Sequence, residues 1–339
     1  IKVEGMNVEK EGLDALSEVM KKQGYYFANQ HTVLKTCSWT RNALTQNRYC
    51  YKCKFYGIES HRCIQMSPAA FWCWNACIHC WRLRPQDAGI NWNETKMPDF
   101  DEDISTLVDK IIEGQRRLLS GYKVHPKVDK TLFEEAMNPK HVAISLTGEP
   151  TLYNRLDELI REFHRRGLTT FLVTRGVRPD VILNLKEKPS QLYISMEAYS
   201  KEMYEWVNQP LVPNAWEMTM RTLEGLSDYG RPTVLRITLI KGINMDEKAV
   251  KGFSKLIEIM QPTYIEPKAY MYVGASMLRL SKDNMPTYEE VISFAEKLSK
   301  ATGYPIRSSS KASRIALLSK LERPIRFGKG CPEGWSQAD

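Results

Sequence analysis

Six short apolar segments, each followed by an amphipathic segment, constrain the fold of this chain more than any other feature. The apolar segments predict strands at 69–74, 141–147, 169–174, 192–197, 233–240 and 264–270. The amphipathic pattern predicts helices at 9–24, 101–119, 153–166, 179–187, 201–207, 215–228, 246–260 and 287–301. Strands that alternate with helices form a parallel sheet. We therefore expect an α/β fold of six β/α units, either a partly closed barrel or an open, doubly wound sheet.

Short polar loops follow the predicted strands. They read TGEP (147–150), TRG (174–176), SMEA (195–198), KGIN (241–244) and YVGAS (272–276), and a cysteine-containing loop follows the first strand. Parallel α/β folds bind their ligands at the carboxyl ends of the strands. These loops therefore predict one shared site.

Seven of the eight cysteines lie between Cys37 and Cys80, and the eighth is Cys331. The start of the chain has no secretory signal, so we expect a cytoplasmic protein whose thiols are reduced. Clustered thiols in such a protein indicate metal binding or redox chemistry more than disulfides. No apolar run approaches the ~20 residues that span a bilayer, so no membrane partner is expected.

Cys73, Cys77 and Cys80 form the pattern C-x3-C-x2-C within one loop. A structural zinc site needs four ligands, and a zinc ribbon built from Cys50-x2-Cys53 with Cys77-x2-Cys80 is one alternative. That alternative leaves Cys37, Cys63 and Cys73 without a role. Three thiolates can instead hold three irons of a four-iron cluster and leave the fourth iron open. The spacing therefore favours a reactive iron–sulfur centre.

The net charge of +8 is concentrated around the cysteines. Residues 31–86 contain eight lysines and arginines against a single acid, Glu59, and aromatic residues are interleaved with them. Residues 301–339 carry a further basic excess. Basic and aromatic side chains together suit phosphates and unstacked bases, which predicts an RNA partner. The candidate phosphate contacts are Arg41, Arg48, Lys54, Arg62, Arg82 and Arg84.

The C-x3-C-x2-C loop after a first strand resembles the signature of radical S-adenosylmethionine (SAM) enzymes. The resemblance implies a partial (β/α)6 barrel and a 4Fe-4S cluster whose open iron binds SAM, which is cleaved to a 5′-deoxyadenosyl radical. His79 stands where that family usually has an aromatic residue, and Thr147 where it usually has glycine. The implied SAM contacts at the strand ends are Thr147, Gly148, Glu149, Thr174, Ser195, Glu197 and Ile240.

Cys37, Cys50 and Cys63 are spaced thirteen residues apart, twice. Together with CWR (80–82) and KFYGI (54–58), this spacing resembles the 4-demethylwyosine synthases, radical SAM enzymes of tRNA modification, over essentially the whole chain. The resemblance implies that Cys37, Cys50 and Cys63 hold a second 4Fe-4S cluster. It also implies that Lys52 forms a Schiff base with pyruvate, or that the second cluster binds pyruvate directly.

The implied reaction condenses N1-methylguanosine, next to the anticodon of tRNA(Phe), with pyruvate. The radical abstracts hydrogen from the methyl group, and loss of pyruvate C1 and ring closure give the tricyclic base, as in a carbon–carbon lyase. The chain resembles the archaeal type without a flavodoxin domain, so we expect an external electron donor protein and a monomer. The alternatives are a two-cluster radical SAM enzyme acting on a peptide or small metabolite, and a non-catalytic metal-cluster RNA-binding protein.

We expect three parts in the chain. Residues 1–68 form an N-terminal helix and the second-cluster segment, 69–304 the barrel, and 305–339 a basic extension packed on the barrel. Residues 30–67 show no regular period and are expected to be irregular. For Cys53 a buried thiol is favoured over a metal ligand, and Cys331 has no predicted role.

Overall fold

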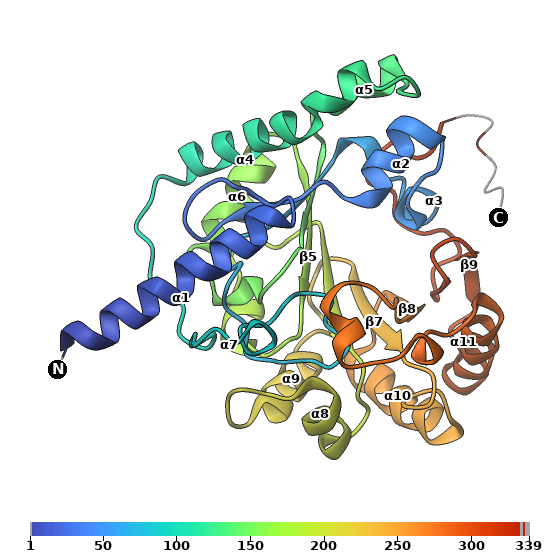
Figure 1. Cartoon of the computed structure of the whole chain (residues 1–339). Coiled ribbons are helices and arrows are strands. Elements are labelled where there is room, and N and C mark those ends of the chain that lie inside the picture. The colour runs from blue at the N-terminus through green and yellow to red at the C-terminus, as the bar shows by residue number, and fades with distance from the viewer. Residues whose placement is uncertain (1, 333–334, 336–339) are drawn as a thin grey trace.

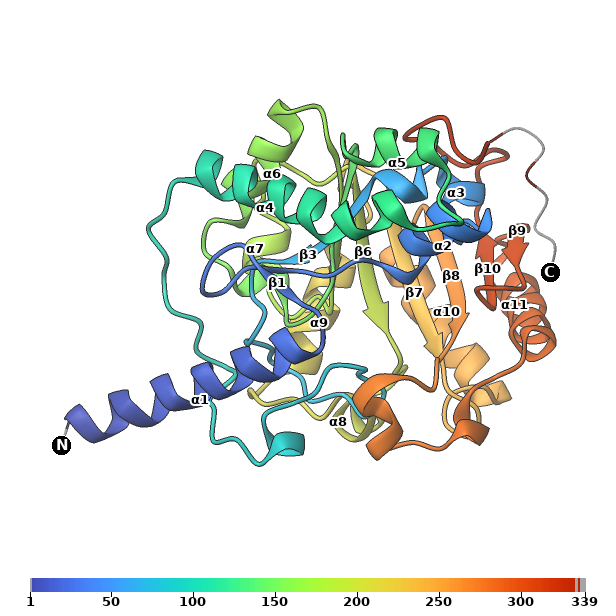
Figure 2. The same ribbon diagram turned by 45° about the horizontal axis from the view of Figure 1, so that its top comes forward.

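In the part of the chain that this computed structural model describes, residues 2–332 and 335, ten strands form one sheet (Figures 1 and 2). The strands are β1 (Tyr26–Phe27), β2 (Val33–Leu34), β3 (Cys63–Ser67), β4 (His141–Ile144), β5 (Thr169–Thr174), β6 (Gln191–Met196), β7 (Thr233–Leu239), β8 (Tyr264–Ala269), β9 (Ile306–Ser310) and β10 (Ile315–Leu318). Their order is β1-β2-β3-β4-β5-β6-β7-β8-β10-β9. Strands β3 to β8 are parallel, and the pairs at both edges are antiparallel. The predicted parallel α/β fold, in its partial-barrel form, is confirmed.

Helices surround the parallel strands (Figure 2). They are α1 (Lys2–Lys22), α2 (Ser38–Gln46), α3 (Tyr51–Tyr56), α4 (Ile104–Leu119), α5 (Lys130–Ala136), α6 (Leu156–Arg165), α7 (Pro179–Ile182), α8 (Lys201–Asn208), α9 (Ala215–Glu224), α10 (Glu247–Met260) and α11 (Tyr288–Thr302). Thr287 caps helix α11, since its hydroxyl accepts a hydrogen bond from the Glu290 amide at 3.2 Å. Among the described residues, no helix is long and apolar enough to cross a membrane.

Alternate residues of the parallel strands enter two different cores. Leu192 and Ile194 of β6 belong to the main core, which the surrounding helices complete. Tyr193, between them, belongs to a separate core inside the barrel. A strand alternates its side chains between the two faces of the sheet, and a parallel sheet buries both. Residues on the inner face can therefore be polar or charged without disturbing the packing of the main core.

Helix α3 closes the amino end of the barrel. Its Tyr51, Phe55 and Tyr56 side chains pack in one buried cluster with Tyr193 of β6 and Tyr264 of β8. The rings of Tyr56 and Tyr264 have centroids 5.2 Å apart. Figures 1 and 2 show α2 and α3 at one end of the strands and α8 at the other. The cysteine-rich segment is thereby part of the barrel and not an appendage to it.

Two expectations about this region are wrong. The first parallel strand is β3, not residues 69–74, which form turns and irregular backbone. Residues 30–67 are not irregular either, because they contain α2, α3 and β3. The two helices are short, and α3 turns its aromatic residues into the barrel, so neither shows a long amphipathic period. Apolar periodicity is informative only over longer windows.

The C-terminal segment extends the sheet before it covers the barrel. Strand β10 pairs antiparallel with β8, and β9 with β10, so residues 306–318 do not form a separate covering layer. The chain then returns to the amino end, where the Phe327 amide donates to the Tyr56 carbonyl at 2.8 Å. The remainder of the predicted terminal parts, residues 1, 333–334 and 336–339, lies outside the described residues.

Phe55→Ala is expected to lower the free energy of unfolding by roughly 3–5 kcal/mol, because it removes a buried ring from the closed end of the barrel. Trp206→Ala serves as the control, since this side chain is 55% exposed and its loss should change stability by less than about 0.5 kcal/mol. Urea unfolding followed by circular dichroism measures both. Equal effects of the two substitutions would contradict the role of α3.

Candidate active site

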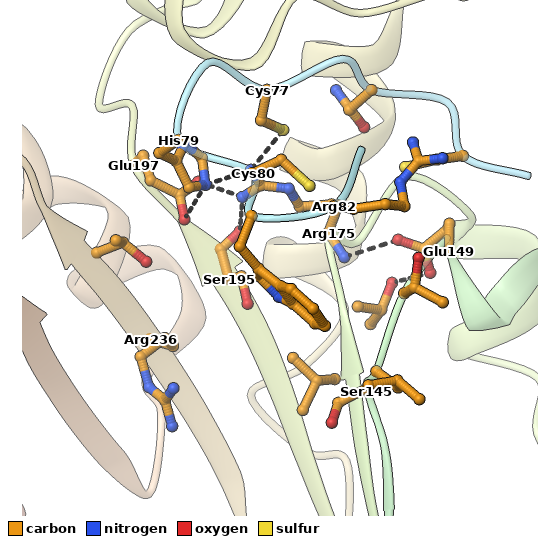
Figure 3. Close-up of a pocket in the computed structure, with 18 of the residues that line it drawn as sticks. Cys77, His79, Cys80, Arg82, Ser145, Glu149, Arg175, Ser195, Glu197 and Arg236 are labelled. Atoms are coloured by element: carbon orange, nitrogen blue, oxygen red, sulfur yellow. Dashed lines mark hydrogen bonds and ion pairs between the residues drawn. The ribbon is translucent and has the colours of Figure 1, made fainter. Parts of the chain in front are cut away.

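A cavity of about 540 Å³ lies at the carboxyl ends of the parallel strands (Figure 3). Residues of β3, β5, β6, β7 and β8, and the loops that follow β3 and β4, line it. The structure brings most of the predicted SAM-site residues together here. Those that line the cavity are Cys73, Cys77, Cys80, Thr147, Gly148, Glu149, Thr174, Ser195 and Glu197.

Arginines fix the loop that carries the first three cysteines. Arg279 donates hydrogen bonds to the carbonyl of Ile78, at 3.1 Å, and to that of Cys80. Asp87 pairs with Arg279 at 2.5 Å and with Arg84 at 3.1 Å. Because backbone carbonyls and ion pairs hold this loop, its sulfurs keep a fixed position without regular secondary structure.

Arg175 is the polar centre of the cavity wall (Figure 3). Its guanidinium donates to the Cys77 sulfur at 2.8 Å and forms an ion pair with Glu197. Glu197 also contacts His79 at 3.3 Å and accepts a hydrogen bond from Asn208 at 3.2 Å. Burial opposes the ionisation of Glu197, but the charges of Arg175 and His79 hold its pKa well below its usual range. A buried, ionised network therefore adjoins the cysteine loop.

The turn after β4 is shaped by Gly148 and Glu149. Gly148 has a φ of +69°, and a Cβ atom there would lie 1.9 Å from the Ala69 carbonyl oxygen, so only glycine fits. The Glu149 carboxylate accepts hydrogen bonds from the Thr174 hydroxyl at 2.6 Å and the Arg175 amide at 3.0 Å. This carboxylate joins the ends of β4 and β5, and the backbone around Gly148 borders the cavity.

Ser195 and Ile240 have different surroundings. Ser195 lines the cavity, and its carbonyl accepts a hydrogen bond from Arg175 at 3.1 Å. Ile240 is fully buried and packs with Ile78 and Val207 beneath the cysteine loop, outside the cavity lining. Its predicted contact with adenine stays a prediction, while its packing against Ile78 supports the loop.

The second cysteine set lies at the amino ends of the strands. Cys37 directly precedes α2, Cys50 directly precedes α3, and Cys63 begins β3, level with His141 at the start of β4. Burial raises the pKa of the Cys50 and Cys63 thiols to about 12, and the charge of Cys37 adds to both shifts. The three thiols thus interact with one another, at the end of the barrel opposite to the first set.

Lys52 lies beside the second set. Its ammonium nitrogen is 4.5 Å from the ring centroid of Tyr193 and 5.2 Å from that of Phe171. Burial lowers the pKa of Lys52, and the charge of Arg236 lowers it further. Among the described residues, no carboxylate pairs with it. A lysine with a lowered pKa has a larger neutral fraction and is a better nucleophile.

The predicted phosphate contacts divide into two groups. Arg82 is not a surface residue, because only 8% of it is exposed and its guanidinium pairs with Glu94 at 2.5 Å. Arg84 is bound to Asp87, and Arg62 to Glu59 at 3.4 Å. The positive charge of these three arginines is therefore neutralised by carboxylates of the same chain. The predicted contacts that remain exposed are Arg41, Arg48 and Lys54.

Cys53 and Cys331 form a disulfide, with Cα atoms 5.4 Å apart. The expectation that all thiols stay reduced is wrong for this pair, which 278 residues separate in the sequence. The structure also does not bring the four zinc-ribbon cysteines together, because Cys77 and Cys80 line the cavity while Cys50 and Cys53 lie at α3, at the other end of the barrel. The free cysteines are the two predicted triads.

Three charged cavity residues were not singled out from the sequence: Arg175, Arg236 and Lys268. Arg236 of β7 pairs with Glu266 of β8 at 2.8 Å inside the barrel. A signal was present, because a charged residue inside an otherwise apolar strand must have a partner or a function. The sequence does not tell which of the two applies.

The first cysteine set fits a 4Fe-4S cluster. Its three sulfurs line one cavity, and burial raises the pKa of Cys73 and of Cys77, so metal binding would replace thiol protons. Arg175 and Asn208 donate to the Cys77 sulfur, at 2.8 and 3.6 Å, as hydrogen-bond donors to cluster thiolates do. The volume also suits a small-molecule ligand such as SAM.

Fold and site together define a radical SAM protein, and the Radical SAM superfamily matches residues 68–252. A second family, described as wyosine base formation, matches residues 259–320. The chain is 44% identical to the S-adenosyl-L-methionine-dependent tRNA 4-demethylwyosine synthase of Pyrococcus horikoshii, over 90% of this chain and 88% of that protein. It is 41% identical to the Methanocaldococcus jannaschii enzyme of the same name, over 92% and 98%. The chain belongs to the family of tRNA 4-demethylwyosine synthases.

Two solved structures agree with this assignment. A structure of TYW1 with a lysine–pyruvate adduct bound has a TM-score of 0.79 at 38% identity, and the match covers 92% of this chain and 97% of that one. A crystal structure of archaeal TYW1 has a TM-score of 0.73 at 35% identity, with 92% and 98% covered. The predicted family and fold are therefore confirmed.

Arg175→Met is expected to cost roughly 3–5 kcal/mol of the free energy of unfolding, because it leaves the Glu197 carboxylate buried without its main partner. Arg175→Lys should recover part of the loss. Arg165→Met is the control, since that arginine lies on the surface of α6 and should leave the urea midpoint unchanged. A wild-type midpoint for Arg175→Met would contradict the account of the network.

Proposed function

We propose that this protein condenses N1-methylguanosine of tRNA(Phe), next to the anticodon, with pyruvate to form 4-demethylwyosine, using two 4Fe-4S clusters. The observation that carries the proposal is the position of two free cysteine triads at opposite ends of one barrel, with a polar cavity at the first triad and Lys52 beside the second. A methylated base and a keto acid can meet there. Cys73, Cys77 and Cys80 would hold the first cluster, and Cys37, Cys50 and Cys63 the second.

When bound, the first cluster and SAM supply a 5′-deoxyadenosyl radical. The chain's own residues place and protect it. Glu149 joins the ends of β4 and β5, so the turn at Gly148 that borders the cavity stays fixed. Arg175 and Glu197 neutralise each other beside Cys77, so no net charge is added next to the cluster ligand.

Lys52 would bind pyruvate covalently. Its lowered pKa provides the neutral amine that attacks the keto carbon, and water leaves as the Schiff base forms. The TYW1 structure with a lysine–pyruvate adduct supports this chemistry in a relative. Direct binding of pyruvate to the second cluster is compatible with the same residues. Loss of C1 as the ring closes makes the reaction that of a carbon–carbon lyase.

The tRNA would bind over the exposed basic residues near the second cysteine set. Arg41, Arg48 and Lys54 lie in or beside α2 and α3 and suit phosphate contacts, whose strength falls with added salt. The relatives are tRNA 4-demethylwyosine synthases, which favours tRNA over a peptide or a small metabolite as the substrate. An external protein would supply electrons to a monomeric enzyme.

Cys37→Ala and Cys73→Ala are each expected to remove one cluster and leave the other. The anaerobically reconstituted wild type should contain about eight irons per chain and each variant about four. Iron analysis with electron paramagnetic resonance measures the content and the type of cluster. Full iron content in both variants would contradict the two-cluster assignment.

Lys52→Met is expected to abolish the reductively trapped pyruvate adduct and to lower product formation by at least about a hundredfold, because the nucleophile is lost. The assay combines reduced enzyme, SAM, pyruvate and tRNA bearing N1-methylguanosine, with unmethylated tRNA as the control. Mass spectrometry detects both the adduct and the tricyclic base. No product from the wild type, with pyruvate and methylated tRNA present, would contradict the proposed function itself.

A further inference from the structure

The arginines that line the cavity are all paired with buried glutamates. The pairs are Arg82 with Glu94 at 2.5 Å, Arg175 with Glu197, and Arg236 with Glu266 at 2.8 Å. Each of these glutamates is at most 2% exposed. A buried charge is costly unless it is paired and hydrogen-bonded, so each arginine carries its own counterion. None of the three is left to bind an anionic ligand alone.

Lys268 is the exception. It stands on the inner face of β8, two residues after Glu266, and lines the same cavity. Within the described residues its ammonium has no hydrogen bond or ion pair, because Glu266 is held by Arg236 and by the Tyr56 hydroxyl at 2.5 Å. The fold therefore positions the Lys268 ammonium at the cavity wall, while Glu266, the carboxylate two residues away, pairs with Arg236 instead. That arrangement leaves a place for an anion from outside.

Lys268 lies close enough to the second cysteine set for the charge of Cys50 to act on it. The charge that acts most strongly on it is that of Arg236, followed by those of Cys50, Glu266 and Arg314. Arg236 lies 5.1 Å from the ring centroid of Tyr193, on which Lys52 also rests at 4.5 Å. Lys52, Arg236 and Lys268 thus share one region of the barrel, and the charge of Glu266, the partner of Arg236, acts on both lysines. Burial and Arg236 lower the pKa of Lys268 to about 8, as expected for a cation that lacks a counterion.

We infer that Lys268 is a positioning residue that binds the carboxylate of the keto acid while Lys52 holds its keto carbon. The inference rests on the proposed function and assigns a second contact to the same substrate. A carboxylate is small enough to share this region with the lysine-bound carbon, and an ammonium is a point charge that needs no planar partner. A cation at the carboxylate also orients the bond to C1, which the reaction breaks.

Lys268→Met is expected to raise the pyruvate concentration at half-maximal rate by roughly ten- to a hundredfold, since it removes one charge-assisted hydrogen bond. The SAM concentration at half-maximal rate should stay unchanged. Lys268→Arg should recover most of the pyruvate affinity. Oxamate, an anionic isostere of pyruvate, should inhibit the wild type and Lys268→Arg more strongly than Lys268→Met. Lys255→Met, at an exposed position of α10, is the matched control and should behave as the wild type.

Reductive trapping in the cluster-loaded enzyme gives a readout that does not need turnover. For Lys268→Met, half-saturation of the Lys52 adduct should shift to higher pyruvate by the same factor, with the adduct still on Lys52. Three outcomes would overturn the inference: an unchanged pyruvate dependence, a shift in SAM dependence instead, or an adduct on Lys268. Each is distinct from failure of the proposed function, in which the wild type forms no product from pyruvate.

Discussion

The packing of α3 into the amino end of the barrel is the interaction on which the rest of the structure depends. Aromatic side chains of α3 and of the strands make this contact largely apolar, so burial of apolar surface is its driving force. The same helix carries Lys52 and follows Cys50, so the contact that closes the barrel also sets a buried lysine amine beside a cysteine triad. The packing that stabilises this end of the barrel therefore also positions Lys52 and the second triad. At the other end, a loop held by arginines carries the first triad.

The charged residues inside the barrel are arranged as a low-dielectric interior requires. A low-dielectric interior tolerates guanidinium groups only with carboxylates beside them. Arg236 pairs with Glu266 on the neighbouring strand, and Arg175, directly after β5, pairs with Glu197, directly after β6. These ion pairs make the cavity wall polar but contribute little net charge to it. Within the described residues, Lys52 and Lys268 are the lysines of this region that pair with no carboxylate, and this is where we propose that a small anionic substrate binds.

Much of the fold and part of the site could be predicted from the sequence. Strands such as 169–174 were located within a residue because their apolar runs are short and bounded by polar turns. The first strand was missed, because β3 alternates polar with apolar residues and the more apolar stretch beyond it forms turns. Arg175 was also missed, although the neighbouring Thr174 was identified, since its role comes from Cys77 and Glu197, which are distant in the sequence.

The sequence by itself determined the family, the alternation that requires a parallel sheet, and the grouping of the free cysteines into two triads. These are local patterns of spacing and periodicity, which a single segment can carry. Only the tertiary structure decided that the triads lie at opposite ends of the barrel, that Arg82 is internal and that Cys53 is bonded to Cys331. It also decided that Lys268 lines the cavity without a counterion among the described residues. Each of these depends on which side chains meet across the sheet, and that is set by register and packing.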